Sequence, residues 1–158
     1  MDTSTPRPSP TRWLIAGGLL VGTLDLLFAS GFWAMRNVPP IRIAQSIAAG
    51  VLGDASFDGG AASAWLGVGL HYFIAMMFVL VYWLMARRAT ALLQQPVRYG
   101  LLYGLLLYLV MNFVVLPLSA AGMPSFNNAS WVAASIAMHL LVGVLCARFA
   151  RRAARVIA

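Results

Sequence analysis

Four polar side chains interrupt long apolar runs of this sequence, and they are the residues best suited to chemistry: Asp25, His71, Asn112 and His139. A carboxylate and two imidazoles can hold a charge or share a proton, and an amide can both donate and accept hydrogen bonds. In a membrane such groups are costly and often mark a path for ions, protons or solutes. The sequence therefore predicts a buried polar layer, provided that the apolar runs cross a bilayer and the four residues lie at one depth.

The composition indicates that the solvent of this chain is a bilayer. Of its 158 residues, 61% are hydrophobic and only 9% are charged, whereas soluble domains carry about 25% charged residues. The net charge of +7 would suit a nucleic-acid partner. However, all 11 basic residues are arginines that cluster at the ends of apolar runs. We therefore expect lipid as the partner and no nucleic acid.

The apolar runs predict an all-α polytopic membrane protein. About 20 residues cross the hydrocarbon core as a helix, and the sequence predicts four such helices in two hairpins, at about 12–34, 61–86, 98–119 and 129–149. The stretch from Tyr99 to Ala147 has no formal charge and is about twice as long as one crossing needs, so it must bend back. The first run is too long for a signal-peptide core and contains Asp25.

Two segments of the chain are not predicted to cross the membrane. Residues 1–10 contain three prolines and are predicted to form a disordered cytoplasmic tail, while 11–158 form a single four-helix domain. Residues 40–53 have helical spacing but are too short to span, so they form a helix at the surface or a re-entrant one. Asp54 and Asp58 follow it, and we expect a turn and helix-cap role for them rather than a cation site.

The arginines predict the orientation. Nine of the 11 lie in the first tail, in the link between the second and third helices, or at the C-terminal end. By the positive-inside rule, this places both termini in the cytoplasm and residues 36–60 outside, as a multi-pass protein of the bacterial inner membrane.

Residue counting places the four polar side chains in one layer. Measured from the outer helix ends, Asp25 lies ~14 Å deep, His71 and Asn112 ~10 Å, and His139 ~15 Å. The expected partners of Asp25 are therefore His71 and His139, because an Asp–His pair holds charge with little net field. The alternative is that the layer only fixes the register of the bundle.

Small residues flank each polar group and predict close helix contacts. Ser63, Gly67, His71 and Ala75 follow one another at intervals of four and so share a helix face. The predicted contact residues on all four helices are Gly18, Gly22, Gly67, Gly100, Gly104, Ser135 and Gly143. Cys146 is the only cysteine, so it is expected to be a small packing residue without a disulfide.

Three stretches resemble a group of small four-helix bacterial membrane proteins without an assigned activity. They are TLDLLFA, IAAGVLGDASFDGGAASAWLGVGLHYFIA and YGLLLYLVMNFVVLPLS. The glycine–histidine helix is also loosely similar to the inner-membrane YagU-type group of unknown function. The resemblance implies a four-helix architecture and no particular mechanism.

The residue pattern leaves three functions open. The favoured one is a protein that handles a small solute, an ion or protons through the polar layer, with Arg36 or Arg42 attracting anions at the outer mouth and a homodimer as its assembly. The second is a non-catalytic subunit whose small faces bind another membrane protein. The third is a redox protein with His71 and His139 as ligands of a b-type haem. We expect no enzyme, since no nucleophile–base pair or metal-binding spacing is present, and no resident cofactor or metal.

Overall fold

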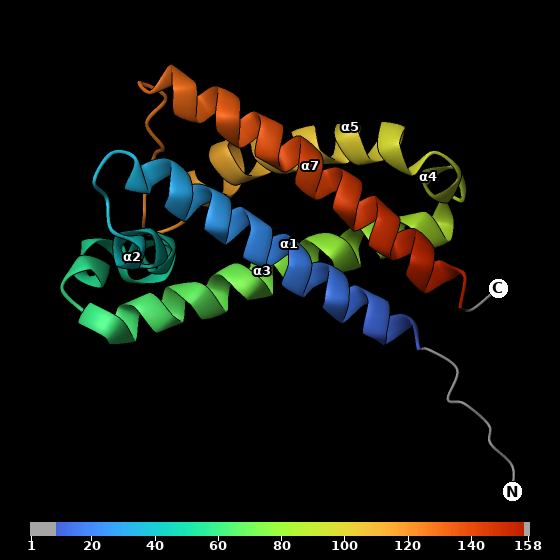
Figure 1. Ribbon diagram of the computed structural model, residues 1–158, viewed down its shortest axis with the longest axis horizontal. Coiled ribbons are helices and arrows are strands. Elements are labelled where there is room, and N and C mark those ends of the chain that lie inside the picture. Colours follow the sequence, from blue (N-terminus) through green and yellow to red (C-terminus); the bar gives the residue numbers. More distant parts are fainter. Residues whose placement is uncertain (1–8, 157–158) are drawn as a thin grey trace, which may run out of the picture.

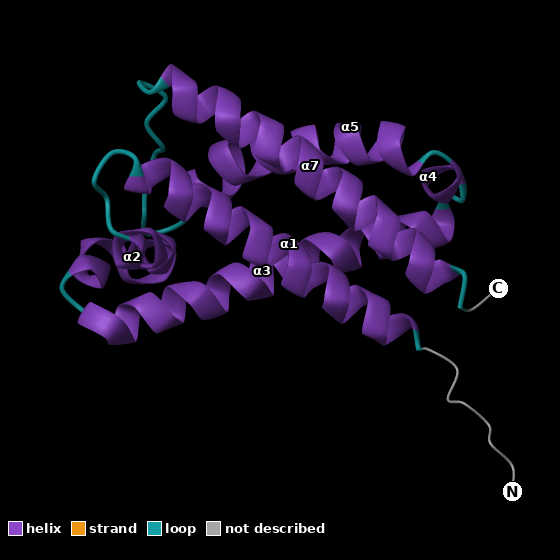
Figure 2. Cartoon of the chain, in the orientation of Figure 1, coloured by secondary structure: helices purple, strands orange, loops and turns teal. Residues whose placement is uncertain are grey.

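Helices form most of the described part of the chain. The computed structural model describes residues 9–156, and no strand occurs within them. Figure 2 shows long helices joined by short loops. In chain order they are α1 (Pro10–Ala34), α2 (Pro40–Leu52), the 3₁₀ helix η1 (Gly53–Phe57), α3 (Gly60–Arg88), α4 (Ala91–Gln94), α5 (Pro96–Val110), the π-helical segment η2 (Met111–Val115), α6 (Leu116–Leu118) and α7 (Ala129–Ala154).

Four helical segments within residues 9–156 are long and apolar enough to cross a membrane. They are α1, α3, the continuous stretch Pro96–Leu118 and α7, with mean hydropathies of 1.7, 2.0, 2.2 and 1.9. We call Pro96–Leu118, which joins α5, η2 and α6, the third span. The all-α polytopic fold predicted from the sequence is confirmed, and the protein is an integral membrane protein.

The two ends of the bundle differ. Figure 1 shows that α1 begins and α7 ends on the side where α4 links α3 to α5. The arginines from 87 to 98 and from 148 to 155 belong to these segments, and we call this side the arginine-rich end. The opposite side carries α2 and the loop that leads into α7 (Figure 1), and we call it the α2 end.

The helices differ from the predicted boundaries at two places. Pro10 is the first residue of α1, so the predicted tail ended too late; residues 1–8 of that tail lie outside the described residues. Helix α7 continues to Ala154 instead of ending at 149. Alanine and arginine are both strong helix formers, and Arg151 and Arg152 in its last turn complement the helix dipole.

The third span is not the regular helix that the sequence predicts for 98–119. Its residues Met111–Val115 form a π-helical segment that ends two residues before Pro117. Proline has no N–H to donate to the carbonyl of Phe113, four residues earlier. A wider turn at this point is a common response to such a missing bond, and it places Asn112 in irregular backbone.

Helix α2 lies across the α2 end of the bundle. It is seen end-on in Figure 1, whereas the four long helices run across the view. Its buried residues include Ala44 and Ala48, which pack against α3 at Gly67. A Cβ on Gly67 would overlap the carbonyl oxygen of Ala44, so this close approach requires glycine. The N–H of Ala120 donates to the carbonyl of Gly50 at 3.0 Å and joins α2 to the second hairpin.

The other predicted contact residues also lie between helices. Gly18 and Gly22 face Met76 and Tyr72 of α3, while Ser135 is buried in α7. Gly100 and Gly104 pack against the backbone of α7 around Gly143, where a Cβ would overlap α5 backbone atoms. In lipid, such glycines allow the backbones to make dispersion contacts that larger side chains would prevent.

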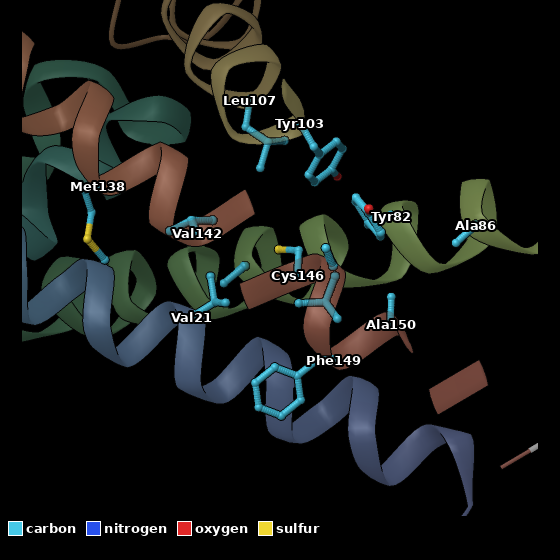
Figure 3. Packing of buried hydrophobic residues seen from close by; sticks show 13 residues of the cluster. Val21, Tyr82, Ala86, Tyr103, Leu107, Met138, Val142, Cys146, Phe149 and Ala150 are labelled. Atoms are coloured by element: carbon cyan, nitrogen blue, oxygen red, sulfur yellow. The ribbon is translucent and has the colours of Figure 1, made fainter. Parts of the chain in front are cut away.

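The core fills the half of the bundle near the arginine-rich end. Figure 3 shows Tyr82 and Tyr103 from two helices pointing toward each other, with Cys146 of a third helix nearby. The two tyrosine rings meet edge to face at 5.1 Å. The Tyr82 hydroxyl donates to Leu92 O at 3.0 Å, and that of Tyr103 donates to Phe78 O at 2.9 Å. Cys146 is fully buried, as its predicted packing role requires.

Candidate functional cavity

A cavity of about 490 Å³ lies between the helices, away from the tyrosine core. Its walls come from α1, α2, α3, the third span, the loop before α7, and α7 itself. Asp25, His71, Asn112 and His139 all line it. Four helices thus bring their predicted polar side chains to one partly open cavity, although these residues are far apart in the sequence.

Asp25 and His71 form the one ion-pair contact within 4.0 Å found among residues 9–156. The distance from Asp25 Oδ2 to His71 Nε2 is 3.9 Å, and the two side chains are 32% and 13% exposed. The same Nε2 lies 2.8 Å from the carbonyl oxygen of Gly22. A carbonyl oxygen only accepts, so Nε2 carries the proton and donates it to Gly22. The carboxylate is adjacent to the imidazole but is not its hydrogen-bond acceptor.

His139 is on the cavity wall but does not pair with Asp25, contrary to the prediction that both histidines would be partners. Its Nδ1 donates to Ser135 O at 2.8 Å, one turn earlier on α7. Its ring also meets Tyr108 edge to face at 5.5 Å. His139 thus bonds a carbonyl of its own helix, whereas His71 bonds a carbonyl of α1.

Asn112 also uses its donor locally. Its Nδ2 donates to Tyr108 O at 2.9 Å, four residues earlier. Helix α5 ends at Val110, and Asn112 lies in the π-helical segment that follows. The side-chain oxygen of Asn112 is left as an acceptor on a residue that lines the cavity.

Aromatic side chains form much of the remaining wall, and the sequence interpretation did not include them. Phe28 stacks on Trp131 with 6.1 Å between ring centroids, and Trp33 lies 5.4 Å from Trp131. All three line the cavity. The available signal was positional: Trp33 lies near the end of the first predicted span and Trp131 near the start of the fourth, both at the same membrane face.

The two arginines expected at an anion-attracting mouth do not line the cavity. The guanidinium of Arg36 lies 4.2 Å from the centroid of the Phe32 ring. Arg42 donates to Phe57 O at 3.1 Å, so it ties α2 to η1. Both guanidinium groups thus make contacts near the α2 end, and neither lines the cavity.

The acidic residues after α2 lie in the expected turn, but the predicted cap is wrong. Asp54 is in η1, and Asp58 follows it. The residue that caps α3 is Gly59, with no side-chain hydrogen bond to the helix start. Within residues 9–156, no group of three or more His, Cys, Asp or Glu side chains is placed to hold a metal ion.

Fold and cavity together define a four-helix integral membrane protein with a partly open, mainly apolar cavity between its helices that carries a few polar side chains. Comparison with known proteins adds no family to this description: no protein-family model, curated protein or solved structure matches the chain. The resemblance to small bacterial membrane proteins therefore stays a prediction.

Proposed function

We propose that this protein binds a small solute in the cavity and exchanges a proton there as the solute binds. The single observation that carries the proposal is the convergence of Asp25, His71, Asn112 and His139 on one cavity. Cavities of about 300–1,000 Å³ with apolar walls and a few polar groups are typical ligand sites. Titratable side chains reach this one from every span: Asp25, His71, Tyr108 and His139.

The proposed location is the bacterial cytoplasmic membrane, with the arginine-rich end inside. The positive-inside rule supports this orientation, which puts the cavity in the outer half. A cysteine introduced at the exposed Thr90 in the α3–α4 link should then resist an impermeant thiol reagent in intact cells. A cysteine at the exposed Ala55 in η1 should react. The reverse pattern would contradict the orientation.

Proteoliposomes loaded with a pH-sensitive dye test the proton exchange. Four solute classes are added in turn: an organic amine, an organic acid, a neutral sugar and an alkali cation. We expect one class to drive proton movement in the unaltered protein. Asp25→Asn should abolish that movement because it removes the carboxylate, and Ala29→Trp should abolish it because Ala29 lines the cavity.

Leu20→Ala is the matched control, since Leu20 is on α1 but is 40% exposed and does not line the cavity. It should retain the movement. No proton movement with any of the four classes would overturn the proposal and favour a non-catalytic subunit of a larger membrane assembly.

We assign no catalytic residue to this protein. We propose that it forms a homodimer, because four helices are few for a transporter.

A further inference from the structure

The electrostatic character of the cavity follows from the charges on its wall. Among the described residues that line it, Asp25 is the only acidic one, and no arginine is present. The other titratable groups on the wall are the two imidazoles and the Tyr108 hydroxyl, and each imidazole donates one hydrogen bond to a backbone carbonyl. Within the described chain, the wall therefore offers one carboxyl group and no arginine or lysine.

Most N–H groups of the polar layer already have acceptors. His71, His139 and Asn112 each donate one N–H, to the carbonyls of Gly22, Ser135 and Tyr108. In a neutral imidazole the second ring nitrogen is an acceptor, and the asparagine amide has one acceptor oxygen and a second N–H. Acceptor atoms therefore outnumber donors among the remaining atoms: His71 Nδ1, His139 Nε2, Asn112 Oδ1 and the Asp25 carboxylate, against one N–H of Asn112.

The Asp25 charge is not cancelled by its neighbour. His71 Nε2 is 3.9 Å from Oδ2, beyond hydrogen-bond length, and gives its proton to Gly22 O at 2.8 Å. A carboxylate on a largely apolar wall attracts a cation more strongly than one in bulk water, and the 32% exposure of the Asp25 side chain leaves it accessible to a ligand.

The aromatic wall adds a second feature that favours a cation. Phe28, Trp33 and Trp131 pack together at the cavity, and aromatic faces attract organic ammonium groups. The indole N–H groups and the Asn128 amide, which also lines the cavity, are neutral donors and do not offset the carboxylate. Ca²⁺ or Mg²⁺ fits poorly, since each takes six or more oxygen ligands and the wall has one carboxylate; among residues 9–156 no three His, Cys, Asp or Glu side chains are placed to hold a metal ion.

We propose that the ligand of this cavity is a protonated amine with an apolar, ring-sized body. Its N–H groups donate to Asp25 and the acceptor atoms of the polar layer, while its apolar part lies against Phe28 and Trp131. This inference rests on the proposed function only in taking the cavity as a solute site, because it concerns binding and not proton movement.

Titration calorimetry on the purified protein in detergent at neutral pH tests the ligand class. The probes share one aromatic body: 2-phenylethylamine, which is protonated, the neutral 2-phenylethanol, and the anionic 3-phenylpropanoate. We expect the amine to bind at least about tenfold more tightly than the alcohol, as an ion pair at reduced dielectric would give. The acid should bind more weakly than the alcohol.

Two isosteric variants show whether Asp25 is responsible. Asp25→Asn should lower the affinity for the amine by about tenfold or more and leave the affinity for the alcohol nearly unchanged. Asp58→Asn is the matched control, because Asp58 is exposed and does not line the cavity, and it should change neither affinity.

Failure of the amine to bind, tighter binding of the acid, or an unchanged amine affinity in Asp25→Asn would each overturn this inference. Amine binding without proton movement in proteoliposomes would refute the proposed exchange and leave the ligand class intact. Proton movement driven by another solute class, with no amine binding, would refute the ligand class and leave the proposed exchange intact.

Discussion

The two halves of the bundle use polar side chains in opposite ways. Near the arginine-rich end, the hydroxyls of Tyr82 and Tyr103 are bonded to backbone carbonyls within a solid core. Toward the α2 end, His71 and Asn112 also donate to carbonyls, but each retains an acceptor on a residue of the cavity wall. A hydroxyl that donates is largely satisfied in a core, whereas an imidazole or amide has a second polar atom that needs a partner.

The glycines show why one half is filled and the other is not. Gly100, Gly104 and Gly143 bring α5 and α7 into backbone contact. Beyond them the third span turns into the π-helical segment, and α2 packs on α3 at Gly67. Close contact of α5 with α7 and of α2 with α3 leaves space for the cavity between the two hairpins. Glycine contacts thus hold α5 against α7 and α2 against α3, and the cavity lies where the helices are not in such contact.

The largest effect is expected where glycine joins α5 to α7. Gly143→Leu places a side chain on the backbone of Gly100 and Gly104 and should destabilise the protein by about 3 kcal/mol. Gly67→Leu, which displaces α2, should have a similar effect. The control Leu20→Ala alters an exposed leucine and should cost about 0.5 kcal/mol. Unfolding in detergent measures all three, and equal stabilities would contradict the assigned contacts.

A pair of enlarged alanines compares the solid and the hollow halves directly. Ala150 is fully buried in the core, so Ala150→Leu should cost about 2 kcal/mol through overpacking. Ala29 lines the cavity, so Ala29→Leu should cost less than about 0.5 kcal/mol or stabilise the protein. Thermal unfolding of the two variants in one detergent provides the comparison. A larger loss of stability from Ala29→Leu than from Ala150→Leu would show that the cavity has no room for the added side chain.

The smallest effect concerns the contact of Asp25 with His71. We expect Asp25→Asn and His71→Gln each to be destabilising, and the double variant to be less damaged than their sum by about 1 kcal/mol. The reason is that each single change leaves the other member without its partner at 3.9 Å. Unfolding free energies of the four proteins complete the cycle. Strict additivity would mean that the two residues do not interact.

Much of this arrangement follows from counting along the helices. A rise of 1.5 Å per residue was sufficient to predict that Asp25, His71, Asn112 and His139 lie near one another, and all four line one cavity. The same counting does not give helix rotation. Whether His139 meets Asp25 or Ser135 O depends on shifts of a few ångströms, so the histidine partners could only be predicted in part.

Other features depend on tertiary packing and had no clear local signal. The π-helical segment needs Pro117 together with neighbours that hold the wider turn in place. The docking of α2 on Gly67 needs two segments that approach each other in space. The aromatic wall was hidden because Trp33 and Trp131 are also common at membrane interfaces, where tryptophan anchors helices without lining any site.

The hydrogen bond from Ala120 to Gly50 can form only after the second hairpin has been synthesised. Gly50 is in the last turn of α2, so its carbonyl has no partner within that helix. Its donor belongs to the second hairpin, which leaves the ribosome after α1, α2 and α3 have been made. Until the second hairpin is made, this carbonyl lacks its bond to Ala120, and Asp25 and His71 lack the cavity walls that the third span and α7 supply. The arrival of the second hairpin satisfies the carbonyl and encloses the polar pair, so insertion of the last two spans is also the step that completes the cavity.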